Sequence, residues 1–274
     1  MKLSISSGAF NRFPLEKQFE MAAGIGFDGI ELCGLRPYTY AFDLDQARID
    51  RILELKSKYR LEIPMYAPEL LQYPFNPASP LAAERRDALR YLKRSVDVAK
   101  GLGTARVLVV CGHAGCDTDR SVNFRNTAGV LREACSYAGE SGVDLLLKPL
   151  PRAESNTAAC LDDVIELMGE VDSPHLKGML DSAAMMANRE PLDACFEKFG
   201  LLLDYIHWGG GAAASNPLFG AAGRLDPAAL FTMAARRGYD GWVGVVAFDH
   251  YTCEPELHAA CEHRLLKEAL AQLG

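Results

Sequence analysis

Apolar residues along the chain follow two alternating patterns, one typical of strands and one typical of helices. Short apolar runs typical of buried strands alternate with longer segments in which apolar residues return every three or four positions, the spacing of an amphipathic helix. The short runs predict strands over residues 2–7, 28–33, 61–66, 105–111, 143–147, 176–180, 203–208 and 241–248. The longer segments predict helices over residues 14–26, 44–59, 82–102, 122–139, 161–168, 191–199, 227–237 and 256–273.

This repetition of strand and helix predicts the fold class. Eight strands, each followed by a helix and with no Pro-, Gly- or Ser-rich linker, favour one parallel barrel over two smaller α/β domains. The length of 274 residues also suits one (β/α)₈ barrel, typically about 250 residues. We therefore expect an α/β protein with a single TIM-barrel domain over residues 1–274.

Composition and charge exclude several classes of protein. With 49% hydrophobic and 24% charged residues, the chain has the composition of a globular protein. Its net charge of −7 argues against a nucleic-acid partner, which needs concentrated Lys and Arg. No apolar stretch approaches a membrane span of about 18 residues, and the N-terminus lacks the apolar core of a signal peptide. We expect a cytoplasmic protein with no membrane partner.

The eight cysteines are scattered without a Cys-x-x-Cys pair, which favours reduced thiols over a zinc ribbon.

Polar residues follow most of the predicted strands. A parallel barrel gathers its functional side chains at the carboxyl ends of its strands, so residues far apart in the sequence converge there. They form a predicted polar pocket for a small molecule, made of Glu31, Tyr66, Glu69, His113, Lys148, Glu154, Asp181, His207, Asp249 and His250.

Lys148 is the residue in this set that most needs an explanation. It closes the buried strand 143–147 and is followed by Pro149. A buried ammonium must reach water, pair with an acid or take part in function, because an isolated buried charge is too costly. Asp181 and His207 end the next two strands and could begin a divalent-metal site. Lys148 and Val246, however, add no ligand from the fifth and eighth strands.

Several motifs together resemble a known family. They are Phe-Asp-Gly-Ile-Glu-Leu at 27–32, Tyr-Ala-Pro-Glu at 66–69, Gly-His-Ala-Gly at 112–115, Lys-Pro-Leu-Pro-Arg-Ala-Glu-Ser-Asn at 148–156, Asp181, Tyr-Ile-His-Trp at 205–208 and Arg-Gly-Tyr-Asp-Gly-Trp-Val at 237–243. Over roughly residues 2–270 the chain resembles the xylose-isomerase-like barrels, and within them the branch of fructoselysine 3-epimerase and the ketose 3-epimerases.

This resemblance implies a metal-dependent sugar isomerase or epimerase. Such enzymes hold manganese or another divalent ion by Glu, Asp, His and Glu at the ends of strands five to eight, and the two glutamates move the proton. In this sequence the four positions are Lys148, Asp181, His207 and Val246. Asp181 and His207 are thus remnant metal ligands, and a further family glutamate is kept as Glu154. The resemblance also implies a homo-oligomer, a dimer or tetramer, for which loop 67–80 is one candidate interface.

Two functions compete on this basis. The first is an enzyme of carbohydrate metabolism that acts on a sugar or a fructosamine-like sugar-amine without a tightly held metal. Lys148, paired with Asp181, would stabilise an oxyanion or serve as the base, and Glu154, His113 and His207 would transfer protons. The second is a catalytically inactive relative, a pseudoenzyme that binds a sugar-like ligand.

Two less favoured functions and a set of substrate-binding residues are also expected from the sequence. A metal-dependent 3-epimerase would need substitute ligands, for which Glu69, His113 and His250 are the candidates. The endonuclease branch of the superfamily would need still more His and acidic ligands. The expected substrate-binding residues are Arg36, Tyr66, Glu69, Asp181 and Trp208.

Overall fold

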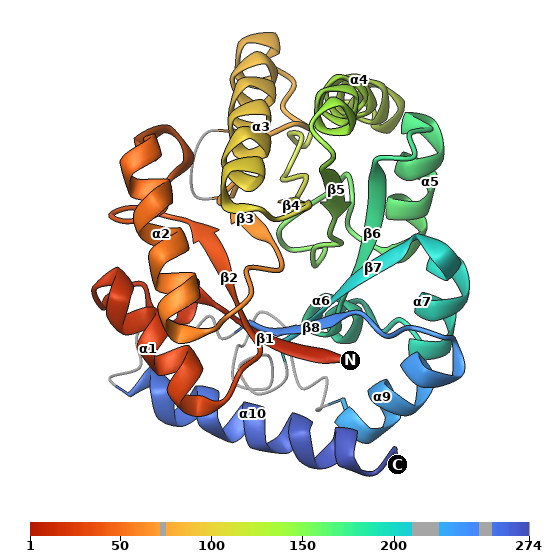
Figure 1. Cartoon of the computed structure of the whole chain (residues 1–274). Coiled ribbons are helices and arrows are strands. Elements are labelled where there is room, and N and C mark those ends of the chain that lie inside the picture. Colours follow the sequence, from red (N-terminus) through yellow and green to blue (C-terminus); the bar gives the residue numbers. More distant parts are fainter. Residues whose placement is uncertain (72–74, 210–224, 247–253, 274) are drawn as a thin grey trace.

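The strands close into a parallel barrel in the order of the sequence. The computed structural model describes residues 1–71, 75–209, 225–246 and 254–273. Each strand pairs with the next along the chain, and the last pairs with the first, so the sheet has no open edge (Figure 1). The strands are β1 (Lys2–Ser6), β2 (Gly29–Gly34), β3 (Tyr66–Pro68), β4 (Arg106–Val109), β5 (Asp144–Leu147), β6 (Leu176–Asp181), β7 (Leu203–Trp208) and β8 (Trp242–Val245). The predicted TIM barrel is confirmed.

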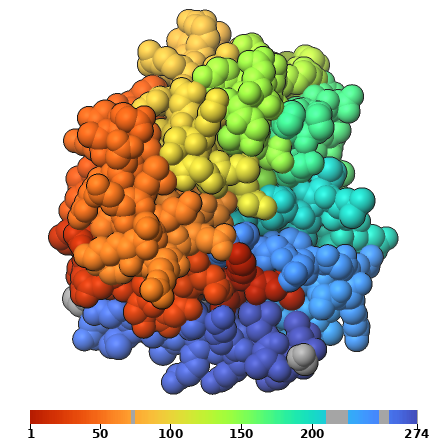
Figure 2. All heavy atoms as spheres, in the orientation of Figure 1, coloured from red at the N-terminus to blue at the C-terminus, as the bar shows by residue number. Residues whose placement is uncertain are grey.

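Helices surround the barrel in chain order, as Figure 1 shows. They are α1 (Leu15–Ile25), α2 (Gln46–Tyr59), α3 (Ala82–Leu102), α4 (Arg120–Glu140), α5 (Leu161–Val171), α6 (Ser182–Asn188), α7 (Leu192–Phe199), α9 (Pro227–Arg236) and α10 (Pro255–Ala271). Short 3₁₀ helices lie in connections of the described segments, namely η1 (Ser7–Phe10), η2 (Ala41–Asp43) and η3 (Gly200–Leu202). In Figure 2 the blue C-terminal segment packs against the red N-terminal segment, where the ring of helices closes. No helix in the described segments is long and apolar enough to cross a membrane.

The third strand departs from the prediction. We expected it over residues 61–66, but β3 is Tyr66–Pro68. The earlier stretch is joined to β2 by an isolated bridge between Gly29 and Glu62 and is not part of a regular strand. Pro64 interrupts the regular ladder, because proline has no backbone N–H to donate. A second difference is α6, which was not predicted. Its seven residues are too few to show a helical period.

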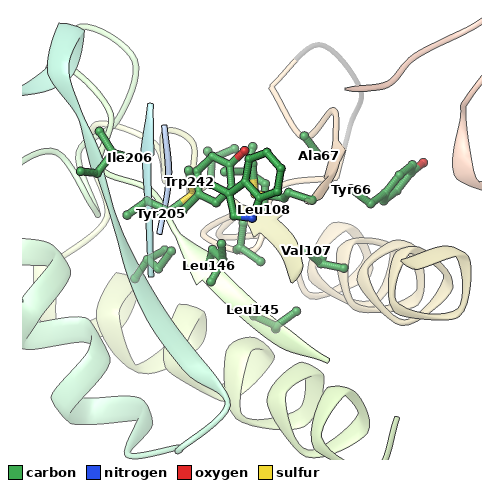
Figure 3. Close-up of a cluster of buried hydrophobic side chains, with 14 of the residues drawn as sticks. Tyr66, Ala67, Val107, Leu108, Leu145, Leu146, Tyr205, Ile206 and Trp242 are labelled. Atoms are coloured by element: carbon green, nitrogen blue, oxygen red, sulfur yellow. The ribbon is translucent and has the colours of Figure 1, made fainter. Parts of the chain in front are cut away.

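Alternation along each strand decides which side chains enter the barrel. Successive residues of a strand point to opposite faces. In Figure 3 Leu146 and Tyr205 lie within the central group of side chains, whereas Tyr66, Val107 and Ile206 point away from it. The parity of the strand therefore places His207 on the face of Tyr205, and Trp208 on the face of Ile206.

Candidate functional site

A buried ion pair lies at the carboxyl ends of β5 and β6. The Lys148 Nζ atom is 2.7 Å from Oδ2 of Asp181, and only 7% and 5% of these two residues are exposed. The Lys148 backbone N–H donates to the Val109 carbonyl, which fixes the main chain at the end of β5. Oδ1 of Asp181 accepts the N–H of Ala184 at the start of α6, which holds the Asp181 carboxylate in place. The structure thus contains the Lys148–Asp181 pair that the sequence suggested.

Both partners of this pair are held in their charged forms. Burial by itself would lower the pKa of the Lys148 amine, but the attraction and hydrogen bond of Asp181 outweigh it, so the pKa is raised. Burial would likewise raise the pKa of Asp181, but the Lys148 charge, His207 and hydrogen bonds hold it below its ordinary value. Lys148 is therefore an ammonium at neutral pH. It supplies positive charge to this end of the barrel.

Asp181 faces His207 on the neighbouring strand, with which it is paired in register. Nε2 of His207 is 3.0 Å from Oε2 of Glu31, and Nδ1 is 3.9 Å from Oδ2 of Asp181. That second distance is too long for a hydrogen bond. Within the described residues Nδ1 has no hydrogen-bond partner, although the His207 side chain is buried.

Glu31 in β2 connects His207 to the interior of the barrel. Its Oε1 atom accepts hydrogen bonds from the Tyr205 hydroxyl at 2.8 Å and from the Ser4 hydroxyl at 3.0 Å. Burial alone would raise the pKa of Glu31, yet His207 and these hydrogen bonds together hold it below its ordinary value. Glu31 is therefore a carboxylate inside the barrel.

Glu154 lies beside the ion pair, in the loop after β5. It is half-buried, and this burial raises its pKa. The Lys148 charge opposes that rise, whereas the negative charges of Asp181 and Glu69 add to it. Glu69, whose Oε1 accepts the Leu71 N–H, thus belongs to the same electrostatic group. Of the predicted site residues, the structure brings together Lys148, Glu154, Asp181, His207 and Glu69.

Two expected substrate contacts point away from this group. The Tyr66 hydroxyl donates to the Thr39 carbonyl at 2.7 Å, and its ring is fully buried on the outer face of the barrel (Figure 3). The Trp208 indole is also fully buried, and its Nε1 donates to Glu262 of α10 at 2.7 Å. Both side chains pack between the barrel and its helices, so the expectation that they contact the substrate is corrected.

Arg36 and His113 are exposed loop residues. Arg36 makes a two-point ion pair with Asp43, at 2.6 and 2.9 Å, and lies over the Tyr40 ring. The His113 Nδ1 accepts the N–H of Gly115, and no hydrogen bond joins His113 to Lys148 or Asp181 in the described part of the chain. Their predicted roles in binding and proton transfer therefore gain no support from these contacts.

Sequence reasoning missed the link between Glu31 and His207, along with Ser4 and Tyr205. Glu31 was noted only as a strand-end carboxylate. Strand parity held the missing signal, because Tyr205 lies two residues before His207 and must share its face. Ser4 likewise lies on the polar face of β1, where Lys2, Ser4 and Ser6 alternate with Leu3 and Ile5.

The described residues do not fit a divalent metal ion. They contain no group of three or more His, Cys, Asp or Glu side chains placed to hold one. Asp181 and His207 are two potential ligands, but the Lys148 ammonium contacts the Asp181 carboxylate where a second cation would be repelled. Val246 is a buried hydrocarbon side chain and offers no ligand. Asp249 and His250, the latter a predicted substitute ligand, lie outside the described residues.

Comparison with known proteins finds relatives that match nearly the whole chain. A family model described as a xylose isomerase-like TIM barrel matches residues 19–269. Fructoselysine 3-epimerase of Shigella flexneri is 34% identical over 260 residues, 94% of each chain. The solved structure of a 3-keto-D-glucoside 4-epimerase from E. coli has a TM-score of 0.82 at 18% identity and covers 98% of this chain and 99% of its own. D-Psicose 3-epimerase from Clostridium cellulolyticum H10, solved with D-tagatose, has a TM-score of 0.79 at 18% identity, with 100% and 97% covered. At that level of identity, the two structures bear on the fold alone.

Proposed function

The chain belongs to the xylose isomerase-like TIM barrel family, and from this premise we propose that it is a sugar epimerase or isomerase that works without a divalent metal ion. Its ligand binds at the carboxyl ends of the strands, beside Lys148 and Asp181. The observation that carries the proposal is the contact of 2.7 Å between these two buried side chains, which puts a fixed cation inside the barrel.

The proposed substrates are ketoses and their amine conjugates. The support is the 34% identity to a protein named fructoselysine 3-epimerase, over 94% of both chains. A fructosamine and a ketose share one reactive unit, a carbonyl group next to a carbon that carries a hydroxyl group. Fructoselysine, D-psicose and D-tagatose are therefore the first ligands to test.

Lys148 has the properties of an oxyanion-stabilising group. When a base removes the proton from the carbon beside the carbonyl, the C–H electron pair forms a carbon–carbon double bond and the carbonyl oxygen gains the negative charge. A preorganised ammonium in a site from which water is excluded stabilises this charge strongly. Because Asp181 keeps Lys148 protonated, the charge is in place before the substrate binds.

Glu154 is the proposed base. It lies in the electrostatic field of Lys148, and it keeps part of its surface accessible. Its raised pKa makes the carboxylate a stronger base than an exposed glutamate. Removal of a proton by Glu154 forms the enediolate and exchanges that hydrogen with solvent. Return of the proton by Glu154 to the adjacent carbon, with transfer of the hydroxyl proton to the former carbonyl oxygen, gives the isomer. The epimer forms when a proton from solvent reaches the opposite face of the first carbon.

Solvent exchange tests this proposal directly. The purified protein, treated with EDTA and checked for metal by elemental analysis, is incubated with each of the three sugars in D₂O. We expect deuterium to enter the carbon next to the carbonyl, at a rate that added Mn²⁺ does not change. Lys148→Met and Glu154→Gln should abolish the exchange, whereas Lys58→Met, at an exposed ion pair, should not. Exchange that stops with EDTA and returns with Mn²⁺ would contradict the proposal.

A binding protein without catalysis is the second candidate. Val246 favours it, because a buried hydrocarbon stands where the resemblance implies the second catalytic glutamate. Calorimetric binding of fructoselysine with no deuterium exchange would select this function over the first.

A further inference from the structure

We propose that Asn156 is a positioning residue that ties the β5 loop (residues 149–160), which carries Glu154, to the main chain of the β4 loop (residues 112–115). Asn76 holds the β4 loop from its other side, so the two asparagines and the two loops form one hydrogen-bonded frame at the carboxyl ends of the strands. The catalytic meaning of this frame rests on the proposed function, whereas its hydrogen bonds do not.

The β5 loop is a closed unit. At its base the Leu150 N–H donates to the Ala158 carbonyl at 3.1 Å. Within the loop the Glu154 N–H donates to the Pro151 carbonyl at 2.8 Å. The Oγ atom of Ser155, which is 1% exposed, accepts two N–H groups of the loop at 3.1 Å. The main chain at Glu154 therefore moves only if the loop moves, and contacts that place the loop also place this carboxylate.

Asn156 joins the β5 loop to the β4 loop through both ends of its side-chain amide. Oδ1 accepts the Ala114 N–H at 2.8 Å, and Nδ2 donates to the Gly115 carbonyl at 3.1 Å. One backbone donor and one backbone acceptor thus match the two ends of the amide. Ala114 is fully buried and Asn156 is half-buried, so water competes little for these bonds. Two hydrogen bonds from one planar group fix both the distance between the loops and their orientation.

Asn76 holds the β4 loop from the side of β3. It lies in the connection between β3 and α3, whereas Asn156 lies in the connection after β5, and β4 is paired between these two strands. Nδ2 of Asn76 donates to the His113 carbonyl at 2.8 Å, and Oδ1 accepts the Ala78 N–H of its own connection at 2.9 Å. The β4 loop is therefore bound on both sides by asparagine side chains.

The Gly-His-Ala-Gly motif contributes main-chain groups to this frame. The asparagines bind the carbonyl of His113, the N–H of Ala114 and the carbonyl of Gly115, while the His113 side chain is exposed. Gly115 has a φ of 87°, in the left-handed region that glycine adopts without steric cost. The motif thus presents a backbone shape to both neighbouring connections.

The frame sets the place of Glu154 relative to Lys148. The main chain of Lys148 is fixed at the end of β5 by its hydrogen bond to Val109. Glu154 lies in the loop beyond, and the amide of Asn156 ties that loop to its neighbour. A misplacement of about 1 Å between reacting groups can cost about 100-fold in rate. Asn156 therefore controls how well the base and the oxyanion-stabilising ammonium fit one substrate.

Kinetics of asparagine variants test the positioning role. In Asn156→Ala and Asn76→Ala, kcat for deuterium entry into fructoselysine should fall about 10- to 100-fold. KM should change little, because the loss affects the transition state and not substrate binding. Asn156→Asp still accepts the Ala114 N–H and should recover part of kcat. Gln18→Ala is the matched control, since this buried amide in α1 donates to the Phe13 carbonyl at 2.9 Å, and it should keep the wild-type kcat.

Amide hydrogen exchange of the protein, followed by mass spectrometry without substrate, tests the frame itself. Loss of one hydrogen bond should speed the exchange of the affected amides about 2- to 10-fold. We expect faster exchange in both the β4 loop and the β5 loop, whether Asn156 or Asn76 is replaced by alanine. Gln18→Ala should leave both loops unchanged.

The outcomes separate this inference from the proposed function. A wild-type kcat in Asn156→Ala, with folding verified by circular dichroism, would overturn the positioning role, and so would a rise in KM alone. Faster amide exchange confined to the loop that carries the substitution would overturn the frame. If the wild-type protein brings deuterium into none of the three sugars, the proposed function and the catalytic meaning of Asn156 both fail, while amide exchange still decides whether the frame exists.

Discussion

Replacing Lys148 by methionine should destabilise the protein strongly, although the two side chains have similar length and volume. The substitution leaves the Asp181 carboxylate buried without the ammonium that lies 2.7 Å away in the native structure. Removal of one partner of a buried ion pair typically costs about 3–5 kcal/mol of the free energy of unfolding. Because both residues are more than nine-tenths buried, solvent screens this pair little.

The assay is a double-mutant cycle in urea at pH 7. Lys148→Met and Asp181→Asn are measured alone and together, and we expect each single variant to lose about 3–5 kcal/mol. The double variant should lose much less than the sum, because it buries no unbalanced charge and Asn can still accept the N–H of Ala184. In thermal unfolding each single variant should melt on the order of 10 °C lower.

Two results would refute this reasoning. A Lys148→Met protein within about 0.5 kcal/mol of the wild type would behave like a surface substitution, and the pair would not be buried and coupled as described. Strictly additive losses would lead to the same conclusion. Lys58→Met, which removes an exposed partner of Glu16, serves as the control and should change stability little.

Three further predictions concern pH and the residues outside the pocket. Burial raises the pKa of Glu154, and Glu154 must be ionised to act as the base. As the pH is lowered, the rate of deuterium exchange should therefore fall at a pH above the ordinary glutamate pKa of about 4.3. A pH–rate profile in which the rate falls only at the ordinary glutamate pKa would argue against this base. Tyr66→Phe leaves the Thr39 carbonyl without its donor and should cost about 1–2 kcal/mol in urea unfolding, with ligand affinity by calorimetry unchanged. Trp208→Phe should likewise destabilise the protein by about 1–3 kcal/mol through loss of the donor to Glu262; a loss of ligand affinity with unchanged stability would return Trp208 to the pocket.

The sequence by itself determined the fold class and the ion pair. The period of the apolar residues predicted α3 over its full observed range, residues 82–102, because helical periodicity is a local property of the chain. The pairing of Lys148 with Asp181 was also predictable, since a cation at the end of a buried strand needs an acid and the next strand ends in one.

Apart from that ion pair, only the tertiary structure decided which polar side chains meet. Trp208 and His207 are neighbours in the sequence, yet the pleat of β7 sends one toward α10 and the other into the barrel. Glu31 and His207 are 176 residues apart, and barrel closure together with the absence of a side chain at Gly244 of β8 brings them into contact. Long-range contacts of this kind depend on strand register and closure, which are properties of the assembled sheet. Local sequence patterns predict where the strands lie, but they do not predict which atoms face each other across the barrel.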